Sequence, residues 1–87
     1  MAADELWTAI ASHSGEPFAT KTGVPFAYTV DGDSLHLHNT NQVLSRRQFE
    51  DAARRKGIAK PSDLGDLRGS SYTWAILHDP RIGIFRG

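Results

Sequence analysis

The spacing of apolar residues along the chain changes early, from a helical period to a period of two. Leu6 and Ile10 recur at helical intervals within residues 4–14, and Gly15 follows as a helix stop. From residue 16 onward, apolar and polar residues alternate, which is typical of strands with one buried face. We therefore predict an N-terminal helix over 4–14, followed by β-structure.

Three strands are predicted in the alternating segment, over 16–21, 25–30 and 34–39. The last two flank the sequence DGD at 31–33. An Asp-Gly pair strongly indicates a tight hairpin because glycine tolerates the positive φ of the turn. Pairing in chain order gives a three-stranded antiparallel meander, whose single apolar face requires helical cover.

The second helix is predicted between Ser45 and Gly57. Ser45 is a preferred N-cap, and Gln48 three residues later completes a capping box. Leu44 and Phe49 stand at the two positions of a hydrophobic staple. Gly57 follows three basic residues and is predicted to end the helix.

A connector over 58–70 comes next, in which Ser62 is predicted to cap a single turn. The final run, SSYTWAILHDP at 70–80, favours a helix capped by Ser70 or Ser71, although its β-branched and aromatic residues allow a hairpin with IGIF instead. The sequence thus predicts a single α+β domain over 1–87, in the order α-β-β-β-α-α, with helices covering the three-stranded antiparallel sheet. The expected core is Leu6, Ile10, Phe18, Phe26, Tyr28, Val30, Leu35, Leu37, Leu44, Phe49, Ala52, Ala53, Leu64, Ile76 and Leu77.

Composition narrows the class of protein. The hydrophobic fraction of 39% and the charged fraction of 23% are those of an ordinary globular domain. The chain has no cysteine, which removes disulfides and thiolate ligands and favours a reducing compartment. No apolar run has the length of a membrane span, and the start, MAADELW, lacks the features of a signal peptide. We expect a cytoplasmic protein without membrane association.

Charge is divided unevenly between the two halves of the chain. Residues 1–45 hold one base and five acids, whereas residues 46–87 hold nine bases and five acids, and the net charge is zero. Such asymmetry indicates an anionic partner for the positive half. The alternative interpretation is that the two halves neutralise each other within the fold.

Two acids moderate the charge of the second helix. Glu50 lies four residues before Arg54, and Asp51 lies four residues before Arg55, so both pairs have the favourable orientation for helical ion pairing. This arrangement alone predicts an ordinary solvated helix face.

Arg46 and Arg47 do not fit that interpretation. They occupy the first helical turn, where the helix dipole disfavours cations and where free N–H groups and arginines together favour phosphate. We therefore predict a small non-catalytic module that binds the phosphates of duplex nucleic acid. The predicted binding residues are Arg46, Arg47, Arg54, Arg55, Lys56, Lys60 and Arg68, and Arg81 and Arg86 are possible additions.

The run Ser45-Arg46-Arg47, with Ala52-Ala53 further along the same helix, is similar to the second-helix start of double-stranded-RNA-binding domains. The order of one helix, three strands and a second helix resembles that family too. The resemblance covers about ten residues plus topology, and is geometric. It implies that basic residues at this helix N-terminus contact phosphates across a groove.

Other functions have weaker support in the sequence. His36 and His38 share one face of a strand, but a metal site needs further ligands, for which His13, His78 and Asp79 are the candidates. We expect these strand histidines to be solvent-facing, and we predict no catalytic site, metal or cofactor.

Two further possibilities concern partners. Tyr72 or Trp74 could stack on a base, although core positions are the commoner place for such residues. A protein-interaction or accessory module of a larger assembly, using the acidic first half or an exposed aromatic, is the alternative function, and a metal-dependent nuclease is a third. The sequence leaves the oligomeric state open.

Overall fold

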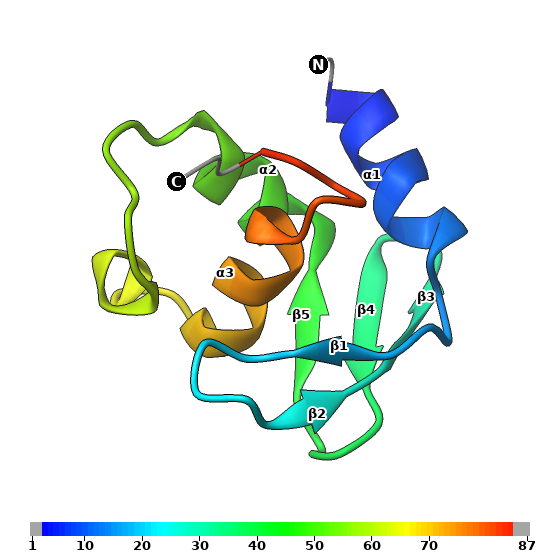
Figure 1. The fold of residues 1–87 in the computed structure, drawn as a ribbon. Coiled ribbons are helices and arrows are strands. Elements are labelled where there is room, and N and C mark those ends of the chain that lie inside the picture. Colours follow the sequence, from blue (N-terminus) through cyan, green and yellow to red (C-terminus); the bar gives the residue numbers. More distant parts are fainter. Residues whose placement is uncertain (1–2, 85–87) are drawn as a thin grey trace.

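A computed structural model of the protein, which describes residues 3–84, has the predicted α+β architecture, in which helices cover a small antiparallel sheet (Figure 1). The elements in chain order are α1 (Ala3–Ser12), β1 (Phe18–Ala19), β2 (Pro25–Phe26), β3 (Tyr28–Asp31), β4 (Ser34–Leu37), β5 (Val43–Ser45), α2 (Arg46–Arg54), the 3-10 turn η1 (Pro61–Leu64) and α3 (Ser70–His78).

The sheet contains different strands from those predicted. Strands β3, β4 and β5 form it, in that order, and β1 pairs only with β2 in a separate two-stranded ribbon. The prediction that residues 16–21 supply a strand of the main sheet was therefore wrong. The outer edge of β3 is occupied instead by the loop after α1, because Gly15 donates its N–H to the Tyr28 carbonyl at 2.7 Å and the Val30 N–H reaches the Ser14 hydroxyl at 2.9 Å. The DGD hairpin joins β3 to β4 as predicted.

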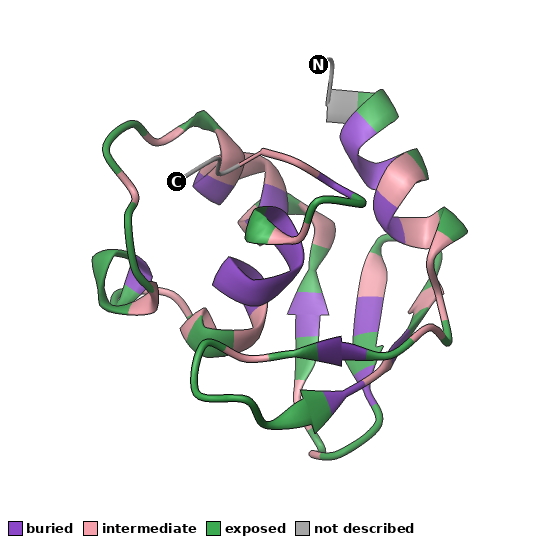
Figure 2. Ribbon diagram, viewed as in Figure 1, coloured by how far each residue is buried: buried purple, intermediate pink, exposed green. Residues whose placement is uncertain are grey.

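One hydrophobic core lies between the inner face of the sheet and the helices (Figure 2). Most of the expected core residues are buried, but Val30 and Ala53 are only half-buried. The opposite face of the sheet is open to solvent, with Thr29, His36 and Val43 paired across its three strands. The core also includes residues that the sequence analysis did not place there: Trp7, Thr73, Trp74, Ala75 and Ile82.

Helix α2 starts as predicted and ends early. The hydroxyl of Ser45 accepts the Gln48 N–H at 3.2 Å, which confirms the N-cap. The helix ends at Arg54, and Arg55 already has extended backbone angles, so Gly57 lies beyond the helix in the following loop. The second half of the predicted capping box is absent from the described residues. The amide nitrogen of Gln48 donates to the Arg68 carbonyl, before α3, and to the Thr73 hydroxyl, within it.

The final element is a helix, as predicted, and its cap differs. Gly69 with φ +62° is the N-cap of α3, in place of the predicted serine at 70 or 71. The connector turn is capped by Lys60 and not by Ser62, although Leu64 does point into the core as this turn requires. Within residues 3–84, no helix combines the length and the apolar character needed to cross a membrane.

Candidate nucleic-acid interface

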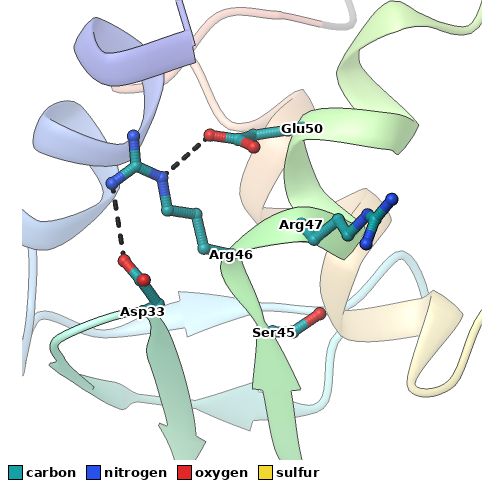
Figure 3. A pocket seen from close by; sticks show the side chains of 5 residues that line it. All are labelled: Asp33, Ser45, Arg46, Arg47 and Glu50. Atoms are coloured by element: carbon teal, nitrogen blue, oxygen red, sulfur yellow. Dashed lines mark hydrogen bonds and ion pairs between the residues drawn. The ribbon is translucent and has the colours of Figure 1, made fainter.

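Arg46, the first residue of α2, is held by three carboxylates from three parts of the fold. Its Nε donates to Glu50 at 2.8 Å, and its two terminal nitrogens reach Asp33 in the β3–β4 turn at 3.5 Å and Asp4 on α1. Figure 3 shows its guanidinium turned toward Asp33 and Glu50. The hydrogen bond with Glu50, then that with Asp4, raises the pKa of Arg46. These acids offset the unfavourable position of a cation at the start of a helix.

Arg55, at the other end of α2, is paired as well. Its two terminal nitrogens bind both oxygens of Asp66 at 2.7 and 2.8 Å, and one of them also binds Asp51 at 2.9 Å. The pair with Asp51 was predicted from the sequence, and the pair with Asp66 in the connector was not. The bond from Arg55 lowers the pKa of Asp66. The predicted partner of Arg54 is also taken, because Glu50 pairs with Arg46.

Arg47 and Arg54 are exposed, and neither side chain has a partner among residues 3–84. Their positions differ by seven, which is about two helical turns, so they lie on one face of α2 about 10 Å apart along the axis. Both line a shallow hollow of about 360 Å³ together with Ser45, Gln48 and Asp51. Arg47 also borders a second hollow of about 430 Å³ beside Arg46, and it points away from the ion pairs of that arginine (Figure 3). These two arginines therefore remain available to an anion.

The backbone amides at the start of α2 are mostly used within the protein. The Arg46 N–H donates to the Asp33 carbonyl at 2.8 Å, and the Gln48 N–H donates to the Ser45 hydroxyl. In the described part of the chain, the Arg47 N–H is left without a partner. An anion here would thus be bound mainly by side chains and less by the helix terminus that the sequence indicated.

The remaining predicted bases follow α2 in the chain: Lys56 lies just after the helix, and Lys60 and Arg68 lie in the connector. Arg68 is exposed, and its carbonyl accepts a hydrogen bond from the Gln48 side chain, which places its backbone beside the first turn of α2. The side chains of Lys56 and Lys60, which precede Arg68 in the chain, are exposed as well. Hydrogen bonds from the backbone amides of Ala59 and Lys60, together with the Lys60 charge, lower the pKa of Asp63. We call Arg47, Arg54 and Arg68 the arginine face, and we treat Lys56 and Lys60 as possible additional contacts.

Arg81 belongs to a different cluster. It binds Asp79 at 2.9 and 3.0 Å and Glu16 at 3.1 Å, and its guanidinium lies 3.8 Å from the centre of the Phe18 ring. It therefore fastens the segment after α3 to the start of β1 and is not free to bind an anion. The other possible addition, Arg86, lies outside the described residues.

The two alternative chemistries, metal binding and base stacking, depend on histidine and aromatic side chains. His36 and His38 are exposed, as expected, and His38 bonds to the Thr29 hydroxyl at 2.6 Å. Across the described ranges, no three histidine or acidic side chains gather closely enough to hold a metal ion. Trp74 is buried and its ring stacks on His78, so it is not open to a base. Tyr72 is half-buried and meets the Phe26 ring nearly at a right angle.

No family model, curated protein or solved structure matches the chain. The site must therefore be interpreted from its own geometry. The residues of the arginine face are all among those predicted from the sequence, which did not indicate that Arg46 and Arg55 are ion-paired to several carboxylates while Arg47 and Arg54 are not. The uneven charge of the two halves was the available signal, since Asp4 and Asp33 of the acidic half neutralise Arg46 of the basic half.

Proposed function

We propose that this protein is a small non-catalytic module that binds the phosphate backbone of duplex nucleic acid through the arginine face. The observation that carries the proposal is the division of the basic residues. Arg46 and Arg55 are each engaged by more than one carboxylate, whereas Arg47 and Arg54 line one hollow without a partner in the described chain.

Unpaired arginines suit this role for physical reasons. An arginine already bound to carboxylates must break those bonds before it can bind phosphate, whereas Arg47 and Arg54 need only release solvent. The planar guanidinium binds phosphate oxygens in a bidentate manner. Phosphate contacts position a protein on a duplex without reading its sequence. The module is therefore expected to bind without base preference. We propose that it acts in the cytoplasm.

The proposal is tested by titrating a fluorescently labelled, mixed-sequence DNA duplex with the protein at several salt concentrations. Three phosphate contacts predict a slope of log K against log salt of about −2.7, which is about a 40-fold loss of affinity between about 50 and 200 mM salt. Contacts from Lys56 and Lys60 would bring the slope to about −4.5. The double variant Arg47→Ala, Arg54→Ala should make the slope shallower by about 1.8.

Lys21→Gln serves as the matched control because it removes an exposed cation outside the arginine face. It should leave the slope unchanged. The proposal is refuted if the wild-type protein does not bind at about 50 mM salt, the low end of the range over which such binding weakens. Equal effects of the control and the double variant would refute it as well.

The alternative function is a protein-interaction module that uses the acidic first half or an exposed aromatic residue. The structure leaves fewer of these residues available than the sequence indicated. Asp4, Asp33 and Glu16 of the acidic half are engaged by arginines, and both Trp7 and Trp74 are buried. Co-purification of a stoichiometric partner, without any binding to the duplex, would favour that alternative.

A further inference from the structure

Gln48 uses its side-chain amide to join α2 to the segment that precedes α3. Its Nε2 donates to the Arg68 carbonyl and to the Thr73 hydroxyl, the latter at 2.9 Å. Thr73 is fully buried on α3 and in turn donates to the Gly69 carbonyl at 3.2 Å. One amide group thus holds three elements in place: the first turn of α2, the end of the connector and α3.

The same segment is held at its other end by α2. Arg55, at the C-cap of α2, binds both oxygens of Asp66, and this bidentate geometry is among the stronger types of hydrogen-bonded ion pair. The chain then passes Gly69, where an added Cβ would lie 3.0 Å from a methyl carbon of Leu44. The segment is therefore attached to α2 at Asp66 and at Arg68, and Gly69 lies close against Leu44 of β5.

We infer that Gln48 and Arg55 are positioning residues, which clamp residues 66–69 along α2 so that Arg68 joins Arg47 and Arg54 in one binding surface. This inference rests on the proposed function. An arginine on a free loop must lose backbone and side-chain entropy when it binds, and that cost reduces its contribution. Clamping the backbone of Arg68 removes part of this cost in advance.

The position of the clamp supports the inference. Gln48 lines the same hollow as Arg47 and Arg54, and the Arg68 backbone lies at its amide. The amide oxygen of Gln48 does not complete the local capping box that the sequence predicted, and its amide nitrogen donates to a residue 20 positions away. The contact therefore contributes to the arrangement of the surface as well as to the start of the helix.

The test is a double-mutant comparison in the salt titration with the labelled DNA duplex. Gln48→Met removes the amide donor without adding charge. It should make the slope shallower by about 0.9, the same change as Arg68→Ala. Adding Arg68→Ala to Gln48→Met should then change the slope no further. Amide hydrogen exchange of residues 66–69 should also become faster in Gln48→Met without any duplex present.

Thr73→Val is the matched control because it removes a buried partner of Gln48 while leaving the bond to the Arg68 carbonyl in place. The Gly69 carbonyl loses the Thr73 hydroxyl but still accepts the backbone N–H groups of Tyr72 and Thr73, both at 3.0 Å. Thr73→Val should lower the melting temperature and keep the wild-type slope. If Gln48→Met unfolds at the assay temperature, Gln48→Asn makes the same comparison, since its shorter side chain no longer reaches the Arg68 carbonyl.

The inference is overturned if the wild type binds with the expected slope and Gln48→Met keeps it, or if Arg68→Ala has the same effect in both backgrounds. The proposed function survives either result. Absence of salt-dependent binding by the wild type would instead refute the proposed function and the inference together.

Discussion

Replacing Tyr28 with phenylalanine tests how α1 is fixed to the sheet. Tyr28 lies on β3 and is fully buried, and its hydroxyl donates to the Ile10 carbonyl in α1 at 2.7 Å. Burial raises the pKa of this phenol well above its ordinary value. Tyr28→Phe removes this one hydrogen bond and leaves the aromatic ring in place.

The expected loss of stability follows from what remains after the substitution. The Ile10 carbonyl still accepts the His13 N–H at 3.3 Å, so it does not become an unsatisfied buried acceptor. The cost is therefore the net value of one hydrogen bond, about 1 kcal/mol. For a domain of this size that corresponds to a decrease in melting temperature of about 4–8 °C.

Urea unfolding measured by tryptophan fluorescence checks this value, since Trp7 and Trp74 are both buried. The dependence of the unfolding free energy on urea should be the same as in the wild type because the surface exposed on unfolding is unchanged. Tyr72→Phe is the control: its hydroxyl accepts one exposed bond from Asn39 and should be worth less than about 0.5 kcal/mol. If Tyr28→Phe were no less stable than this control, the bond would not anchor α1.

Three other outcomes are expected. Arg46→Gln should lower the melting temperature and keep the salt slope of duplex binding. Arg47→Gln should keep the melting temperature and make the slope shallower, because Arg46 is ion-paired and Arg47 is not. Phe49→Ala, at a fully buried position, should cost about 3–5 kcal/mol in urea unfolding, a large part of a total of about 4–13 kcal/mol. Stability should also fall on acidification below about pH 4.5, since bonding to His13 and Arg81 lowers the pKa of Glu16 and bonding to Arg81 lowers that of Asp79.

The sign of the acid effect is fixed by the direction of these shifts. A carboxyl whose pKa is lower in the folded state adds stability above its ordinary pKa of 4.5 for Glu16 or 3.8 for Asp79, and this stability is lost as the pH falls toward the folded value. The melting temperature followed from pH 7 to pH 3 measures it, with Asp79→Asn as the variant that should show a smaller acid loss. A melting temperature that rises on acidification would contradict the roles of Glu16 and Asp79. For the two arginine variants, a larger loss of binding in Arg46→Gln than in Arg47→Gln would contradict the separate prediction that only the unpaired arginine binds phosphate.

The sequence by itself determined the local features of this protein. Ser45 capped α2 because a hydroxyl one residue before a helix can accept a free N–H, and the Asp-Gly pair made the β3–β4 hairpin because its turn needs a residue with positive φ. Helical and strand periods identified most of the buried residues. These features depend on residues within a few positions of one another.

The tertiary structure alone decided which groups meet across long separations. Strand β1 could have joined the main sheet, but the loop at Ser14 and Gly15 occupies the edge of β3. Arg46 was predicted as a phosphate ligand together with Arg47, but the fold brings Asp4, 42 residues away, to Arg46. The sequence supplies the charges, but an ion pair depends on distances of a few ångströms, and only the folded chain sets those.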